Sequence, residues 1–157
     1  MGKPLEEPML INEDLIVLNL PAKSKSEAIQ MLAEKAAAAG RVADAAGYRD
    51  AVLHREGEYS TGMGFGVAIP HGKTNAVTEP LLMYATVESM DWQSLDGNPI
   101  DIIFMIGVPA DNAGDVHLKI LANLSRRLMK EEFRTSLRAA SSPTAVLKVL
   151  QDYEIGL

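Results

Sequence analysis

The apolar positions of the chain fall into runs and periodic sets that predict alternating strands and helices. Apolar or loosely alternating runs predict strands at residues 15–20, 81–88 and 100–108, the last apolar enough to be buried on both faces. Apolar residues at helical spacing predict helices at about 25–39, 45–56, 113–130 and 131–139, and a last one from Pro143. Strands separated by pairs of helices predict a three-layer α/β fold, and we expect residues 1–157 to form one domain.

Polar residues and glycines mark where these elements begin and end. Ser24 and Glu27 form the pattern of a capping box, and Gly40 is placed to end the same helix. Asp44 is a candidate cap for the second helix. The pair at 96–97, Asp-Gly, predicts a turn between the last two of the three strands.

The stretch 60–75 combines regularly spaced glycines with a short apolar run and a Pro-His-Gly sequence. It reads Ser-Thr-Gly-Met-Gly-Phe-Gly-Val-Ala-Ile-Pro-His-Gly-Lys-Thr-Asn. Glycine stands at 62, 64 and 66, and glycine permits unusual backbone angles and close approach. The run 67–69 predicts a brief buried strand, and Pro70 should end it because proline lacks a backbone donor. We therefore expect His71 at a strand tip. The stretch fits either a tight turn with an incidental histidine or a stiff mount for a functional one.

The other two histidines differ in their surroundings. His54 falls late in the second helix, and we expect it on the surface. His117 falls in the first turn of the helix 113–130, in line with apolar residues that should face the sheet. Alone, His117 fits a histidine at the edge of the core. A helix N-terminus favours anions, however, so His117 near His71 would make a small site of phosphate size.

Charge and composition exclude several classes of function. The net charge of -6 leaves no basic footprint for DNA or RNA. The chain has no cysteine, which excludes disulfides, thiolate catalysis and thiolate metal sites. No apolar run is long enough to span a bilayer, and the first residues lack the apolar core of a signal peptide. We expect a cytoplasmic protein.

Three other kinds of site can be tested against these residues. The segment 66–74 resembles a nucleotide-binding Gly-x-x-x-x-Gly-Lys-Thr loop, but five residues separate its two glycines and Pro70 interrupts it. A zinc site could combine His71, His117 and Asp115, yet no spacing in the sequence supports it. The Gly-x-Ser-x-Gly elbow of a serine hydrolase is absent.

Phosphorylation of histidine fits the residues better on chemical grounds. Neutral imidazole is a nucleophile, and with an ordinary pKa of about 6.5 imidazole is largely neutral near pH 7. A phosphoryl group in transfer carries negative charge on three oxygens, which backbone amides, a helix N-terminus and a guanidinium can stabilise. No cofactor is required, neither nucleotide nor metal, if the phosphoryl donor is another phosphoprotein.

Two segments of the chain carry a resemblance to a known family: residues 61–73, Thr-Gly-Met-Gly-Phe-Gly-Val-Ala-Ile-Pro-His-Gly-Lys, and residues 99–104 with 117–122. The first is similar to the active-site signature, and the second to the other shared block, of enzyme IIA of the fructose/mannitol type. This family belongs to the bacterial phosphoenolpyruvate-dependent sugar phosphotransferase system (PTS) and includes nitrogen-regulatory IIA. The resemblance covers about 10–154. It implies a three-layer α/β/α sandwich in which helices cover both sides of a mixed β-sheet.

The resemblance also implies roles for three residues. His71 would take a phosphoryl group from the phosphocarrier protein HPr and pass it to a IIB component, usually onto a cysteine. The chain would thus be a phosphotransferase with a phosphohistidine intermediate, serving uptake of a sugar or sugar alcohol. His117 matches the assisting histidine of the family, and Arg55 matches the arginine that holds the phosphoryl group. The family's phosphorylated nitrogen is Nε2, which leaves Nδ1 for an orienting bond.

The chain departs from the family pattern at Phe65, a signature position that is often polar in relatives. Because cysteine is absent, we expect IIB to be a separate protein, and the acidic charge would suit a basic partner surface. Two functions stay open: phosphoryl transfer for uptake, and a nitrogen-regulatory role in which phosphorylation of His71 controls protein contacts. A module that binds partners without phosphorylation is a third, and the presence of His71, His117 and Arg55 together speaks against it.

Overall fold

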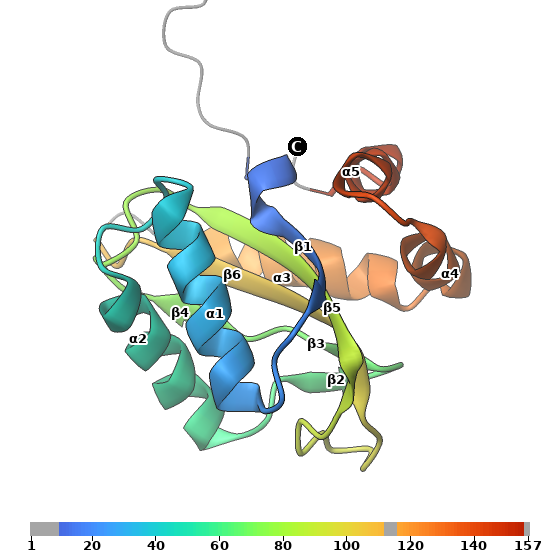
Figure 1. The fold of residues 1–157 in the computed structure, drawn as a ribbon, viewed down its shortest axis with the longest axis horizontal. Helices are drawn as coiled ribbons and strands as arrows, with labels where there is room; N and C mark the ends of the chain where they lie inside the picture. The colour runs from blue at the N-terminus through green and yellow to red at the C-terminus, as the bar shows by residue number, and fades with distance from the viewer. Residues whose placement is uncertain (1–9, 112–115, 156–157) are drawn as a thin grey trace, which may run out of the picture.

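The structure is a computed structural model in which residues 10–111 and 116–155 are described, residues 116 and 117 by their backbone alone (Figure 1). Its strands form one sheet in the order β1-β5-β6-β3-β2, with β4 also paired to β6. The sheet is mixed, because β5 runs antiparallel to β6 while β3 and β4 run parallel to it. The strands are β1 (Ile16–Leu20), β2 (Gly62–Gly64), β3 (Val67–Ala68), β4 (His71–Lys73), β5 (Leu81–Met90) and β6 (Ile100–Val108).

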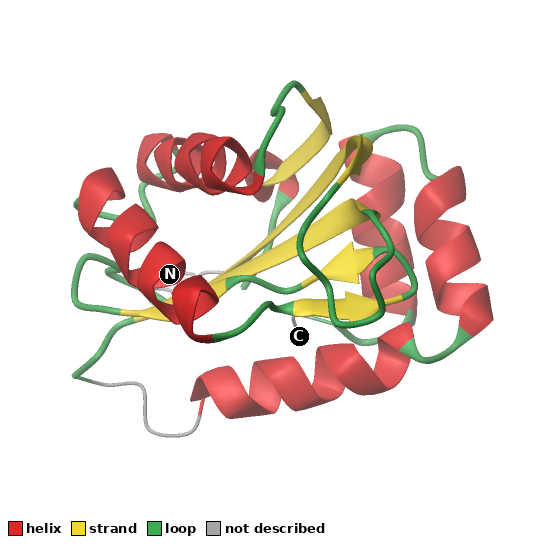
Figure 2. Cartoon of the chain, turned by 90° about the horizontal axis from the view of Figure 1, so that it is seen from below, coloured by secondary structure: helices red, strands yellow, loops and turns green. Residues whose placement is uncertain are grey.

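Helices cover both faces of this sheet (Figures 1 and 2). Two of them, α1 and α2, lie on one face, whereas α3 lies on the other, with α4 and α5 beside it. The predicted three-layer α/β/α sandwich is confirmed. In the described part of the chain, no helix is long and apolar enough to cross a membrane. The helices are α1 (Lys25–Ala38), α2 (Ala45–Glu58), α3 (Val116–Leu128), α4 (Glu131–Ala139) and α5 (Pro143–Asp152).

The strand β6 forms the centre of the sheet. It pairs with β5 on one side and with β3 and then β4 on the other. Every residue of 102–108 is buried, which confirms the strand that its apolar sequence predicts. The strands β3 and β4, on either side of Ile69 and Pro70, are thus attached to the most protected part of the fold.

The predicted helix ends are confirmed in most details. Ser24 Oγ accepts a hydrogen bond from the amide of Glu27 at 3.1 Å, and Asp44 caps α2 in the same way. Gly40, just past α1, has a φ of 82°. The Glu27 carboxylate accepts from the amide of Lys23 at 2.6 Å, one residue earlier than a capping box predicts. The first strand begins at 16 rather than 15 because residues 13–15 form a 3-10 turn.

His71 lies at the end of a strand, as expected, but it opens the strand β4 rather than following the run 67–69. The chain leaves the β6 ladder after Ala68 and returns to it at His71, which opens β4 opposite Ile106. Pro70 has no N–H and interrupts the ladder, but its carbonyl still accepts a hydrogen bond from the amide of Ile106 at 3.0 Å. His71 therefore begins a second short strand, and the centre of the sheet holds its backbone.

Two glycines allow α2 to lie close to β4 and β6. A Cβ on Gly107 would lie 2.9 Å from two ring carbons and the hydroxyl oxygen of Tyr48, and a Cβ on Gly72 would lie 2.9 Å from Cγ2 of Val52. Both distances are well inside van der Waals contact, so this packing requires glycine at both positions. Tyr48 and Val52 are fully buried, and burial raises the pKa of the Tyr48 hydroxyl.

This close packing predicts opposite effects for two glycine substitutions. Gly107→Ala should lower the free energy of unfolding by about 1–3 kcal/mol, because the added methyl group meets the buried Tyr48 ring. Gly57→Ala is the matched control: its Cβ meets nothing within 4 Å in α2, and helical alanine should raise stability by about 0.5–1 kcal/mol. Urea unfolding of both variants measures this, and a Gly107→Ala protein as stable as the parent would contradict the packing.

Candidate active site

His71 is half-buried, and one of its ring nitrogens is held by the backbone. Its Nδ1 lies 2.8 Å from the carbonyl oxygen of Ile69. A carbonyl oxygen can only accept a hydrogen bond, so Nδ1 must carry the proton. In the neutral ring the lone pair is then on Nε2. The structure thus selects the tautomer of His71 in which Nδ1 carries the proton and Nε2 the lone pair.

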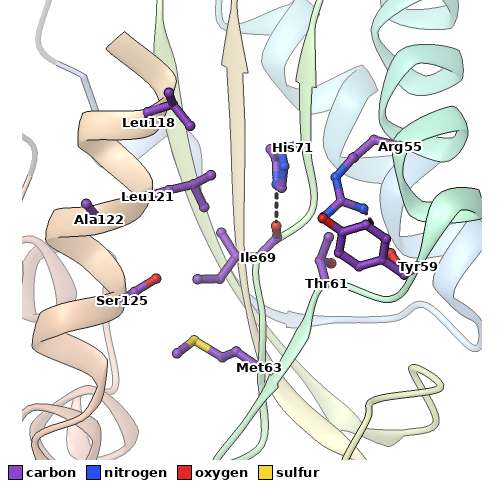
Figure 3. Close-up of a pocket in the computed structure, with 10 residues that line it drawn as sticks. All are labelled: Arg55, Tyr59, Thr61, Met63, Ile69, His71, Leu118, Leu121, Ala122 and Ser125. Carbon is purple, nitrogen blue, oxygen red and sulfur yellow. Dashed lines mark hydrogen bonds between the residues drawn. The ribbon is translucent and has the colours of Figure 1, made fainter. Parts of the chain in front are cut away.

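The His71 side chain lies in an open pocket of about 520 Å³ between α2 and α3 (Figure 3). Strand β2 and the segment leading to His71 form its floor. In Figure 3 the side chains from the end of α2 lie on one side of His71, and those of α3 lie on the other. The pocket is lined by Arg55, Tyr59, Thr61, Met63, Ile69, His71, Leu118, Leu121, Ala122 and Ser125.

Arg55 contributes a fixed cation to this pocket. Its Nη1 donates a hydrogen bond to the carbonyl oxygen of Tyr59 at 2.9 Å, and its guanidinium carbon lies 4.1 Å from the centroid of the Tyr59 ring. Arg55 follows Val52 by one helical turn, so the contact of Val52 with Gly72 places it beside His71. A stacked guanidinium with a planar donor edge is suited to bind an oxyanion.

Helix α3 forms the opposite wall of the pocket. Leu118, Leu121, Ala122 and Ser125 are spaced as one face of a helix, and all four line the pocket. His117 lies in the first turn, directly before Leu118, but its side chain falls outside the described residues. The N-terminal end of α3 is therefore next to the pocket, where the helix dipole favours negative charge.

Phe65 lies on the turn between β2 and β3 and does not line the pocket. Its φ of 61° is unusual for a bulky residue and occurs between two glycines that also have positive φ. Arg138 donates to the Phe65 carbonyl at 2.8 Å, and the guanidinium carbon of Arg134 lies 4.0 Å from the ring centroid. Arg138 also hydrogen-bonds Asp101, which raises its pKa. Two arginines thus hold Phe65, which is 47% exposed.

The described residues offer no group of three or more histidine, aspartate or glutamate side chains that could hold a metal ion. The zinc set considered from the sequence includes Asp115 and the side chain of His117, and both lie outside the described residues. The site as described consists of a half-buried imidazole, a guanidinium and a helix start. These groups suit an anion that forms a covalent bond with nitrogen.

Comparison with known proteins identifies the family. Residues 9–153 match the family model described as "Phosphoenolpyruvate-dependent sugar phosphotransferase system, EIIA 2". The chain belongs to this EIIA family. A fructose-specific EIIA component of the PTS from Haloferax volcanii is 45% identical over 140 residues, which are 88% of this chain and 90% of that protein.

Two further relatives of this EIIA chain are a longer PTS component and a regulatory protein. A fructose-specific EIIABC component from Bacillus subtilis is 36% identical over 146 residues, which are 92% of this chain but only 23% of that protein. Nitrogen regulatory protein IIA-Ntr from Neisseria meningitidis has the same fold, with a TM-score of 0.83 and 29% identity over 90% of this chain and 96% of that one.

The fold brings two of the three sequence-predicted residues of this EIIA chain together. His71 and Arg55 line one pocket, and α3 places the backbone of His117 at its edge. Thr61, which lies inside the signature segment, and the buried Glu56 that it contacts were not predicted from the sequence as residues of the site. One signal was available for Glu56: it follows Tyr48 and Val52 at helical spacing and so falls on the buried face of α2.

The bond from His71 to Ile69 predicts a specific NMR signature. In protein labelled with ¹⁵N and held at a pH of about 8.5, where ordinary imidazoles are neutral, His71 should show a protonated Nδ1 and an unprotonated Nε2. His54 on the surface of α2 serves as the reference ring in the same long-range ¹H–¹⁵N spectrum. A His71 ring protonated mainly on Nε2 would exclude the geometry described.

Proposed function

We propose that this chain is the phosphoryl-transfer component of a sugar PTS and that His71 carries the phosphoryl group. The donor is the phosphorylated phosphocarrier protein HPr, and the acceptor is a separate IIB component. The observation that carries the proposal is the hydrogen bond from Nδ1 to Ile69, which leaves the lone pair on Nε2 in a pocket of an EIIA-family chain. The sequence holds no cysteine, so an acceptor thiolate must lie outside these 157 residues.

The chemistry is two successive transfers on the same nitrogen. The lone pair of Nε2 attacks phosphorus, the bond to the donor nitrogen breaks, and a P–Nε2 bond forms. Nδ1 keeps its proton, so the ring becomes cationic, and its bond to the Ile69 carbonyl turns into a charge-assisted one. In the second transfer an acceptor thiolate attacks phosphorus, and the P–Nε2 electron pair returns to the ring. The carbonyl thus orients the nucleophile and stabilises the phosphorylated state.

Two groups are positioned to stabilise the phosphoryl oxygens. Arg55 lies beside His71, and its guanidinium is held against the Tyr59 ring. The start of α3 supplies the positive end of a helix dipole. We propose His117, in that first turn, as the assisting histidine. None of these groups needs a nucleotide or a metal, because the donor already carries an activated phosphoryl group.

The rim of the pocket suits contact with a protein. Tyr59 and Leu118, on opposite sides of the pocket, are 64% and 57% exposed and so offer apolar surface that a partner could bury. The openness of the site on this side would let a phosphohistidine of another protein reach Nε2. The net charge of -6 favours steering toward basic partner surfaces, and a phosphocarrier and a IIB component could use the same face in turn.

The relatives favour uptake of a sugar over regulation and make fructose the first sugar to test. The Haloferax volcanii protein, 45% identical, is named as fructose-specific. The second candidate function is regulatory, with the phosphorylation state of His71 controlling protein contacts, and the likeness to nitrogen regulatory protein IIA-Ntr favours it. A transfer screen of the phosphorylated chain against the separate IIB proteins of the host discriminates the two: transfer to one IIB supports uptake, and transfer to none supports regulation.

The proposal predicts a single phosphoryl adduct. Incubation with phosphoenolpyruvate, enzyme I and HPr should add one acid-labile phosphoryl group, detected by intact mass. His71→Ala should abolish the adduct, whereas His54→Ala, the matched control at an exposed histidine, should keep it. An adduct that persists in His71→Ala, or no adduct on the parent chain, would sink the assignment.

Variants of the two assisting residues should separate their roles. Arg55→Ala should slow transfer in both directions by about 100-fold, because the transferring oxygens lose a fixed cation. His117→Ala should still accept the phosphoryl group but transfer it onward poorly. Rapid-quench measurements of each half-reaction test both expectations. Unchanged rates in Arg55→Ala would remove this residue from the site.

A further inference from the structure

A buried carboxylate lies directly behind the pocket. Glu56, the residue after Arg55 in α2, is 7% exposed, and both of its oxygens accept hydrogen bonds. Oε2 accepts from the amide of Thr61 at 2.9 Å and from Lys25 Nζ at 3.1 Å, and Oε1 accepts from the Thr61 hydroxyl at 2.5 Å. A buried carboxylate is tolerated only when it is paired and hydrogen-bonded in this way. Glu56 therefore fixes the segment that follows α2.

Thr61 links this carboxylate to the rest of the site. Its hydroxyl donates to Glu56 and accepts from Trp92 Nε1 at 3.2 Å, so its rotamer is fixed from two sides. Its backbone amide also donates to Glu56, and its carbonyl accepts from the amide of Ile69 at 3.1 Å. Lys25, which pairs with Glu56, lies 5.3 Å from the centroid of the Trp92 ring. Each polar group of Thr61 thus has a defined partner.

The path of hydrogen bonds ends at the imidazole. The Ile69 amide donates to the Thr61 carbonyl, and the Ile69 carbonyl accepts from Nδ1 of His71. The peptide units on either side of Ile69 are therefore held between Thr61 and His71. At the other end, Glu56 is adjacent to Arg55 and anchors the last turn of α2. One buried carboxylate is therefore connected to both the nucleophile and the cation of the pocket.

We propose that Glu56 and Thr61 are positioning residues for the transfer reaction. Through Ile69 they hold the carbonyl oxygen that selects the tautomer and orientation of His71, and through α2 they hold Arg55 beside it. The effect on the transfer rate rests on the proposed function. The effect on the imidazole does not, because the tautomer of His71 can be measured without any phosphoryl donor.

The decisive variant is Thr61→Val, which keeps the shape and backbone of the residue and removes only its hydroxyl. Glu56 and Trp92 then each lose a buried hydrogen-bond partner. The bond from the Ile69 amide to the Thr61 carbonyl remains, but the segment that carries this carbonyl loses two of its side-chain anchors. We expect the ¹⁵N resonances of His71 to move toward a mixture of both tautomers. We expect kcat for phosphoryl transfer to fall on the order of tenfold to 100-fold, since misplacement of a reacting group costs that much, with little change in KM for phospho-HPr.

Two further variants separate positioning from general destabilisation. Thr61→Ser restores the hydroxyl and should recover both the NMR signature and the rate. Thr86→Val is the matched control: Thr86 in β5 accepts a hydrogen bond from the amide of Asn19 at 2.8 Å, and it pairs with Ile102, away from the His71 partner Ile106. It should lower stability without changing the His71 ring or the rate. If Thr61→Val fails to fold, Glu56→Gln, of the same size but without the charge, takes its place.

The outcomes are distinct. A Thr61→Val protein with an unchanged His71 spectrum and unchanged kcat overturns the positioning role, as does a Thr61→Ser protein as impaired as Thr61→Val. If Glu56→Gln is used instead, an unchanged His71 spectrum together with an unchanged kcat overturns the positioning role in the same way. If the parent chain accepts no phosphoryl group, the proposed function fails, and the NMR comparison alone decides whether Glu56 and Thr61 set the tautomer.

Discussion

The geometry of the site depends on the two hydrogen bonds made by the backbone of Ile69. Its amide donates to Thr61 and its carbonyl accepts from His71, at 3.1 and 2.8 Å. This arrangement is possible because Pro70 interrupts the β6 ladder at this point, so the backbone between β3 and β4 can make bonds outside the sheet. The chain returns to the sheet at once, and the central strand β6 keeps the histidine backbone in place.

The second requirement is that α2 lies close to the sheet. Gly72 and Gly107 give room for Val52 and Tyr48, and this contact brings the last turn of α2, with Arg55, next to the first residue of β4. The pocket is therefore assembled from parts that the core already holds in position. Little has to be reorganised when a phosphoryl group arrives, which is the condition for electrostatic stabilisation of the transfer. The residues that move into contact can then belong to the partner protein.

Local features of the site were predictable, and its supports were not. The helix caps at Ser24 and Asp44 and the buried strand β6 follow from local sequence patterns, and the presence of His71 and Arg55 in one pocket follows from the family resemblance. The sequence did not predict that the chain pairs with β6 again after Pro70, because proline normally ends the ladder of a strand. The partners Lys25–Glu56 and Thr61–Trp92 are each 31 residues apart, so no local pattern announces them. Phe65 also needed the structure, since its arginine partners come from α4.

Because the Ile69 carbonyl holds Nδ1, we propose that Nε2 of His71 carries the phosphoryl group. NMR of the ¹⁵N-labelled, phosphorylated protein tests this, because the ¹⁵N–³¹P coupling identifies the nitrogen bonded to phosphorus. We expect phosphorus on Nε2 of His71 and a protected proton on Nδ1. Phosphorus on Nδ1, or on any other residue, would refute the proposed role of the Ile69 carbonyl.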